Sequence, residues 1–366
     1  MSDEQRSKNE QRNASNAAND ITTSNDTTTG AHNVAKEPVI SVRDLTVSFA
    51  SEAGTVHAVR GMNFDLYPGK TLGIVGESGA GKSVTSMAIM GLLDKNASVK
   101  GSITYHGEEL LSKSDLEMSE IRGKGIAMVF QDPLSALTPV FSIGDQIKEA
   151  LVTHNPKMTE RQIHDRSIEL MNLVGIPDPE DRLKSFPHEF SGGMRQRVAI
   201  ALALSLDPKL MVFDEPTTAL DVLVQHEVMN TIRELQASEG FTAILISHDL
   251  GIVLESTTRV MVMHNGVIVE DAPSGQILRA PKDDYTKMLL SHYGDPRAER
   301  VSVPGLDRKG TYDPNATPTE ADKAMTLTVT GVSKVYKGRK RGDKPVTATN
   351  NVSFTLHPGE SLALVG

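Results

Sequence analysis

One eight-residue stretch constrains the fold of this chain more than any other. Residues 76–83 read Gly-Glu-Ser-Gly-Ala-Gly-Lys-Ser, which fits the phosphate-binding pattern G-x-x-x-x-G-K-[ST]. The apolar run Thr71–Val75 before it predicts a short buried strand, and Val84–Leu93 after it predicts a helix. A glycine-rich turn followed by chance by Lys-Ser is the alternative. The strand–loop–helix order favours a loop that binds nucleotide phosphates.

The chemistry of this loop assigns roles to its residues. Glycines let backbone N–H groups approach an anion closely, and the following helix directs its positive N-terminal end to the same place. We expect Lys82 to reach the β- and γ-phosphates of ATP, and Ser83 to bind Mg²⁺. The residues predicted to bind the nucleotide here are Gly76, Glu77, Ser78, Gly79, Ala80, Gly81, Lys82, Ser83 and Val84.

Two later apolar runs also end in polar side chains. Leu210–Glu215 ends in two carboxylates, and the run at 241–246 is followed by Ser-His-Asp, with His248 in the middle. Ligands gather at the carboxyl ends of parallel strands. Asp214 is thus predicted to hold Mg²⁺, mostly through water, and Glu215 to orient or deprotonate an attacking water. For Asp214 and Glu215 the alternative is a solvated acidic pair at the end of a strand. For His248 we favour a contact with the γ-phosphate, and the alternative is a structural histidine.

Two further features are compatible with a nucleotide site. Ser191 is a good N-cap for a helix, and Gly192 and Gly193 in its first turn favour close approach of another group to this helix end over a merely flexible helix start. Phe49 precedes the phosphate-binding loop at a distance that allows it to stack on a nucleotide base. A role as a core side chain is about as plausible for Phe49.

Composition limits the remaining classes of protein. The 38 Lys and Arg against 47 Asp and Glu give a net charge of −9, which argues weakly against a nucleic-acid binder. The chain has no cysteine, so disulfides, thiolate metal sites and cysteine-ligated iron–sulfur clusters are excluded. Neither a secretory signal nor an apolar run long enough for a membrane span is present, so we expect the protein in the cytoplasm.

In this order, the motifs resemble the nucleotide-binding subunit of ABC transporters over residues 39–293. The resemblance identifies Gln131 as the Q-loop residue, which would bind Mg²⁺ and take part in catalysis, and Ser191–Met194 as the signature motif. Asp221 matches the D-loop aspartate, and His248 the switch histidine. Finer details, such as Phe130-Gln131-Asp132-Pro133, are similar to the oligopeptide, dipeptide and nickel importer branch. Phe190 departs from the usual leucine of the signature, which is a mild change.

The resemblance implies a fold and a domain plan. The fold is an α/β P-loop NTPase of the ABC type: a RecA-like parallel-sheet core with an antiparallel β subdomain and a helical signature subdomain. We expect residues 38–273 to form this ATPase domain and 274–294 to be a C-terminal extension typical of oligopeptide transporters. Residues 1–37 are polar and predict a disordered tail, and 295–325 predict a linker.

The end of the chain repeats its beginning. Residues 351–359 parallel 61–69, and Val332–Tyr336 parallels Leu45–Phe49, so Tyr336 aligns with Phe49. We interpret 326–366 as the N-terminal piece of a second ABC domain in a tandem protein. By resemblance, two such domains close on two ATP molecules, each bound between one P-loop and the other domain's signature motif. The second domain would be supplied in cis, or by another copy in trans.

The resemblance also implies partners. We expect an ATPase at the cytoplasmic face of the membrane, bound peripherally to two permease subunits and served indirectly by an extracellular solute-binding protein, most plausibly for peptides. Nickel, glutathione and sugar importers share these motifs. A non-transport ABC ATPase would be expected to carry a coiled-coil insertion, a basic arm or cysteine-bound zinc. A degenerate subunit would lack catalytic residues that are present here: Lys82, Glu215 and His248.

Overall fold

The computed structural model describes residues 37–51, 54–218, 220–292, 326–336, 345–358 and 362. The predicted linker of residues 295–325 lies outside this part of the chain, and so does the predicted tail except for Glu37. These residues form a large domain, which begins at Pro38 and extends to residue 292, and a hairpin after residue 326.

A six-stranded sheet forms the centre of the large domain. Five of its strands are parallel, and the edge strand β10 runs antiparallel to β9. In spatial order the strands are β10 (Val267–Pro273), β9 (Arg259–His264), β3 (Thr71–Val75), β8 (Thr242–Ser247), β7 (Leu210–Asp214) and β6 (Ile126–Val129). This confirms the predicted α/β fold, and it places the carboxyl ends of β3, β7 and β8 side by side.

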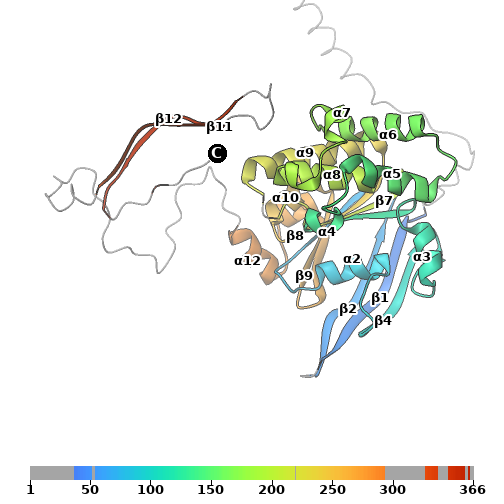
Figure 1. Cartoon of the computed structure of the whole chain (residues 1–366). Helices are drawn as coiled ribbons and strands as arrows, with labels where there is room; N and C mark the ends of the chain where they lie inside the picture. The colour runs from blue at the N-terminus through green and yellow to red at the C-terminus, as the bar shows by residue number, and fades with distance from the viewer. Residues whose placement is uncertain are drawn as a thin grey trace, which may run out of the picture. The chain divides into compact units, whose positions relative to one another are not determined.

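A second, antiparallel sheet lies against one face of the first. Its strands are β2 (Gly54–Leu66), β1 (Ile40–Ser51), β4 (Ala97–Tyr105) and β5 (Glu108–Glu109). Helices α2 (Lys82–Met90) and α3 (Asp115–Ile121) are on the same side of the domain (Figure 1). The helix predicted at Val84–Leu93 begins two residues earlier, at Lys82, and ends earlier, at Met90. It ends there because Gly91 takes a left-handed conformation (φ 62°).

Helices cover the other face of the central sheet (Figure 1). The segment between β6 and β7 supplies α4 (Pro133–Ala136), α5 (Ile143–His154), α6 (Glu160–Leu173), α7 (Pro179–Arg182), the 3₁₀ turn η1 (Pro187–Glu189) and α8 (Gly192–Leu204). The later helices are α9 (Val222–Glu239), α10 (Leu250–Ser256), α11 (Ser274–Arg279) and α12 (Asp284–His292). Of the described helices, none is both long enough and apolar enough to cross a membrane.

Strand alternation divides the core into two apolar clusters. Met211 and Phe213 of β7 face the helices, whereas Leu210 and Val212 face the antiparallel sheet. Because successive side chains of a strand point to opposite faces, one fully buried apolar strand contributes to both clusters. The central strands are therefore packed on both faces, and this packing fixes the positions of the loops that follow their carboxyl ends.

The predicted C-terminal extension, which the structure describes as far as residue 292, is not one continuous helix. It forms α11 and α12, which are separated by residues 280–283, and Pro281 lies in that break. Proline lacks the N–H that a continuous helix needs. The break lets α12 turn away from α11.

The hairpin after residue 326 consists of β11 (Leu327–Tyr336) and β12 (Val346–Leu356). It has the same local irregularity as the hairpin of β1 and β2. Gly331 and Asn351 have positive φ angles, as do their sequence equivalents Asp44 and Gly61. The Gly331 N–H donates to the Ser353 hydroxyl (2.8 Å), as the Asp44 N–H donates to the Asn63 side chain (3.0 Å). The internal repeat thus extends from sequence to backbone conformation, while the assignment of residues 326–366 to the N-terminal piece of a second ABC domain stays a prediction.

Candidate functional site

The phosphate-binding pattern forms the loop between β3 and α2. Gly81, the N-cap of α2, has φ 103°, and a Cβ there would lie 2.2 Å from the Ala58 carbonyl oxygen. A Cβ on Gly76 would lie 2.1 Å from the carbonyl oxygen of Met263. Both glycines are therefore required by the close approach of backbone from β2 and β9. Gly79, with φ 82° and open space around it, is required by its backbone conformation alone.

Lys82 is buried at the base of this loop. Its ammonium donates hydrogen bonds to the carbonyl oxygens of Gly76 (2.8 Å) and Glu77 (2.9 Å), and it lies 3.7 Å from Glu215 Oε1. Burial lowers the pKa of Lys82, although the neighbouring carboxylates of Glu215 and Asp214 oppose this. A buried cation interacts more strongly with an entering anion than a cation in bulk water does, because the surroundings have a lower effective dielectric constant.

Asp214 ends β7 directly beside α2. The Ser83 hydroxyl donates to Asp214 Oδ1 (2.9 Å), and only 4% of the Asp214 residue is exposed. Burial raises the pKa of Asp214, and the hydrogen bond from Ser83 offsets part of that rise. A hydroxyl and a carboxylate are the hard oxygen ligands that Mg²⁺ uses, so the pair is chemically suited to hold that ion.

We expect Asp214→Asn to raise the thermal stability of the nucleotide-free protein at pH 7.5. A carboxyl whose folded pKa is raised destabilises the fold once pH exceeds the unfolded pKa, so removing the charge relieves a penalty of roughly 1 kcal/mol. The gain should shrink as the pH falls through the ordinary carboxyl pKa of 3.8, because below that value the carboxyl is neutral in both states. Melting temperatures across this pH range check it, and a variant less stable at pH 7.5 would contradict the assignment.

Glu215 follows Asp214 in a strained backbone conformation. Its φ is 48°, and its N–H donates to the Ile246 carbonyl (2.9 Å), which ties it to β8. The carboxylate Oε2 accepts hydrogen bonds from Gln131 Nε2 (3.1 Å) and Thr218 Oγ1 (2.9 Å), and His248 Nδ1 lies 3.1 Å from it. Left-handed non-glycine residues cluster at functional sites. The structure thus brings the four predicted catalytic residues, which include Lys82, into one cluster.

These side chains line a hollow of about 580 Å³. It lies at the carboxyl ends of β3, β7 and β8, where ligands of α/β sheets bind. Gly76 and Ala80 are buried and do not line it. The lining residues are Ala58, Glu77, Ser78, Gly79, Gly81, Lys82, Ser83, Val84, Gln131, Glu215, Thr218, His248 and Leu289.

Phe49 is not among the described residues that line this hollow. Its half-buried side chain packs at the edge of the apolar cluster on the antiparallel sheet, and its backbone pairs with Val56 and Ala97. The base-stacking role stays a prediction.

The signature and D-loop residues also lie outside the hollow of their own chain. Ser191 caps α8 by accepting a hydrogen bond from the Met194 N–H (3.3 Å), and Asp221 caps α9 by accepting one from the Val224 N–H (3.0 Å). Each helix therefore begins with a satisfied cap. Any nucleotide contact made by these residues would involve a different molecule from the one in this hollow.

Gly193 has a packing role that sequence reasoning missed. A Cβ on Gly193 would lie 2.2 Å from Val224 Cγ1, so glycine lets α8 approach α9. We expect Gly193→Ala to destabilise the fold by about 1–3 kcal/mol, because the β-branched valine cannot move aside. Urea unfolding measures the change. Gly192→Ala is the matched control, since its nearest neighbour is the flexible end of Leu220 at 3.2 Å; equal losses in both variants would refute the packing role.

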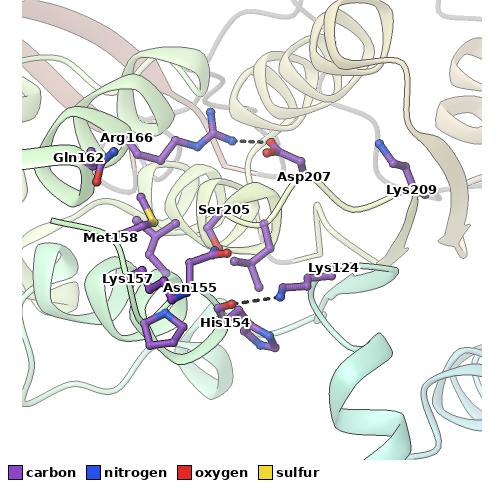
Figure 2. Close-up of a pocket in the computed structure, with 13 residues that line it drawn as sticks. Lys124, His154, Asn155, Lys157, Met158, Gln162, Arg166, Ser205, Asp207 and Lys209 are labelled. Carbon is purple, nitrogen blue, oxygen red and sulfur yellow. Dashed lines mark hydrogen bonds and ion pairs between the residues drawn. The ribbon is translucent and has the colours of Figure 1, made fainter.

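A second hollow, of about 880 Å³, lies near the amino ends of β6 and β7, and Figure 2 shows the residues that line it. Lys124 and Lys209, which precede β6 and β7, line it together with Arg166. Arg166 donates to Asp207 (2.6 Å), and Lys124 donates to the His154 carbonyl (3.0 Å), as Figure 2 shows. It contains no glycine-rich loop and lies at the amino ends of the strands, so the smaller hollow is the better nucleotide site.

Four residues of the site region were not predicted from the sequence to have a role there. Ala58, Thr218 and Leu289 line the hollow, and Tyr285 accepts a hydrogen bond from the Glu77 N–H (3.1 Å). Thr218 lies only three residues after Glu215, a spacing that could have indicated it. No local signal marks Leu289 and Tyr285, because they reach the loop from about 200 residues further along the chain.

Comparison with known protein families gives one family for this region. The ABC transporter family, described as "ABC transporter", matches residues 59–218. The dipeptide transport ATP-binding protein DppD of Bacillus subtilis is 47% identical over 276 residues, which cover 75% of this chain and 79% of that protein. The oligopeptide transport ATP-binding protein OppD of Mycobacterium tuberculosis is 45% identical over 74% of this chain, a match that spans 42% of its own length.

Solved structures give the same fold. The dimeric structure of MJ0796, a bacterial ABC transporter cassette, has a TM-score of 0.58 and 24% identity, and covers 64% of this chain and 98% of that chain. The structure of cbiO1 from Clostridium perfringens, part of the ABC transporter complex cbiONQ, has a TM-score of 0.58 and 28% identity over 71% of this chain and 97% of that chain. The arrangement of sheets and helices is therefore one found in nucleotide-binding cassettes.

Proposed function

The chain belongs to the ABC transporter family, and from this premise we propose that it is the ATP-binding and ATP-hydrolysing subunit of an importer that takes up peptides. One observation carries the proposal. Lys82, Glu215 and His248 meet on one hollow with the glycine-rich loop, at the carboxyl edge of a parallel sheet. The relatives named as dipeptide and oligopeptide transport ATP-binding proteins support the cargo class.

The residues around the hollow would divide the work of hydrolysis. Bound MgATP supplies the γ-phosphoryl group and a cation that neutralises developing charge. The loop N–H groups and Lys82 would hold phosphate oxygens, and Ser83, Asp214 and Gln131 would hold the metal and its water. Glu215, kept in place by its hydrogen-bond partners, would orient and deprotonate water, while His248 would support the γ-phosphate.

Exposed apolar side chains in the helical region support membrane partners. Leu134, Val140 and Phe141, just after Gln131, are 48%, 72% and 51% exposed. Apolar groups gathered on the surface next to a catalytic residue favour a protein interface. We propose that this surface contacts one of two permease subunits, and that the chain is bound peripherally at the cytoplasmic face. An extracellular solute-binding protein would act on the other side of the permeases.

The domain plan follows from the same reasoning. We propose that residues 38–273 form the ATPase domain, 274–294 its oligopeptide-transporter-type extension, and 326–366 the start of a second ABC domain. The hairpin of β11 and β12 supports the last assignment, because it has the same irregularity as β1 and β2. The apolar side chains of Leu327 and Val332 are 53% and 47% exposed, whereas their equivalents Ile40 and Leu45 are buried in the core of the large domain. Apolar side chains at these positions would be buried in the same way in a second ABC domain.

Affinity purification of the full chain from membranes of its native host tests the importer assignment. We expect two permease subunits to copurify, and peptide uptake to stop when the chain is absent. Recovery of ribosomes or DNA in a salt-sensitive manner, without permeases, would instead support a non-transport ATPase. Uptake of nickel, glutathione or sugar in place of peptides would change the cargo class alone.

A further inference from the structure

Helix α12 reaches the phosphate-binding loop through one hydroxyl group. The peptide group between Gly76 and Glu77 is hydrogen-bonded at both ends: its N–H donates to Tyr285 Oη (3.1 Å), and its carbonyl accepts from Lys82 Nζ (2.8 Å). Hydrogen bonds in a chain polarise one another, and a peptide group bonded at both ends cannot rotate without losing both bonds. The hydroxyl of Tyr285 thus fixes the orientation of one of the two carbonyl groups that accept hydrogen bonds from Lys82.

Tyr285 is itself held firmly. Its ring lies against that of His264, with centroids 4.0 Å apart, and His264 ends the strand whose Met263 carbonyl closes on Gly76. The segment leading into α12 is fixed by Glu270, a buried carboxylate that accepts hydrogen bonds from the N–H groups of Lys282 (2.9 Å) and Asp283 (3.0 Å). Burial raises the pKa of Glu270, but these hydrogen bonds outweigh it and the net pKa is lowered.

The next turn of α12 continues toward the site. Leu289, four residues after Tyr285 and therefore on the same face of the helix, lines the hollow. Leu289 and Leu290 also pack against the main apolar cluster. The helix is thus anchored to the core and presents one polar and one apolar group to the loop and the hollow.

We propose that Tyr285 is a positioning residue for nucleotide binding, and that it acts through the Gly76–Glu77 peptide group on Lys82. The inference rests on the proposed function, because it takes the hollow to be an ATP site. The C-terminal extension is then part of the nucleotide site, and displacement of α12 weakens ATP binding without any change in the loop sequence.

Binding of MgATP to the full chain, followed by calorimetry, tests this. Tyr285→Phe keeps the ring on His264 and removes only the hydroxyl, so we expect a melting temperature at most a few degrees below that of wild type. We expect an affinity about five-fold weaker, the scale of one net hydrogen bond. Tyr105→Phe is the matched control, because it removes a hydroxyl bonded to the Gly125 carbonyl (3.1 Å) on the other side of the domain. Its affinity should equal that of wild type.

Two further measurements separate this route from a general structural role. In a Lys82→Ala background the Tyr285→Phe effect should fall below about two-fold, since the coupling partner is gone. Without nucleotide, the Glu77 amide should exchange its hydrogen faster in Tyr285→Phe than in wild type and Tyr105→Phe. Equal affinity, equal exchange, or a full effect that persists without Lys82 would each overturn the inference. Failure of the wild type itself to bind MgATP would instead overturn the proposed function.

Discussion

Glu215→Gln is expected to leave MgATP binding intact and to lower turnover by about 10²- to 10⁴-fold. The substitution preserves the shape of the side chain and its place beside Gln131 and Thr218. It removes the carboxylate that can take a proton from water. Phosphate release under saturating ATP measures turnover, and calorimetry measures binding.

The control for this substitution lies on the same chain. Glu234 is exposed on α9, so Glu234→Gln removes the same charge far from the hollow. It should hydrolyse ATP like wild type. If Glu215→Gln did the same, Glu215 would have no role with water, and its left-handed backbone would need another explanation.

The parts of the site that sequence predicts are those encoded by neighbouring residues. Apolar runs predict β3, β7 and β8, and because they are parallel their ends must meet, which places Glu215 near Lys82 although 133 positions separate them. The limits of α2 were less accurate, because the left-handed Gly91 ends that helix before the apolar pattern does. Short-range patterns combined with one topological rule therefore recover most of the catalytic cluster.

What sequence did not predict depends on distant contacts. Two glycines at the start of α8 indicate close approach, but the pattern cannot say to what; in the structure Val224 provides an intramolecular reason for Gly193. Tyr285 meets the loop because Glu270 and Pro281 redirect the chain after α11. Such contacts come from tertiary packing, which local propensity does not contain.

The exposed start of α8 is the part of this chain that would complete a composite ATP site with a second copy. Ser191 lies outside the hollow of its own chain, and by resemblance it would contact ATP held by another domain. We therefore expect Glu215→Gln to form dimers in MgATP, because ATP persists between the two copies. We expect Ser191→Arg, added to that variant, to bind ATP normally and stay monomeric, since a bulky cation at the start of α8 prevents close approach to the partner loop.

Size-exclusion chromatography with light scattering, with and without MgATP, distinguishes these states. In otherwise wild-type protein, Ser191→Arg should also lower turnover by at least about ten-fold, the scale for loss of a group that stabilises the transition state. Lys184→Glu, an exposed charge change elsewhere in the helical region, should leave dimer formation and turnover unchanged. Full turnover by a strictly monomeric Ser191→Arg protein would mean that one chain completes its own catalytic site, and the composite arrangement would have to be abandoned.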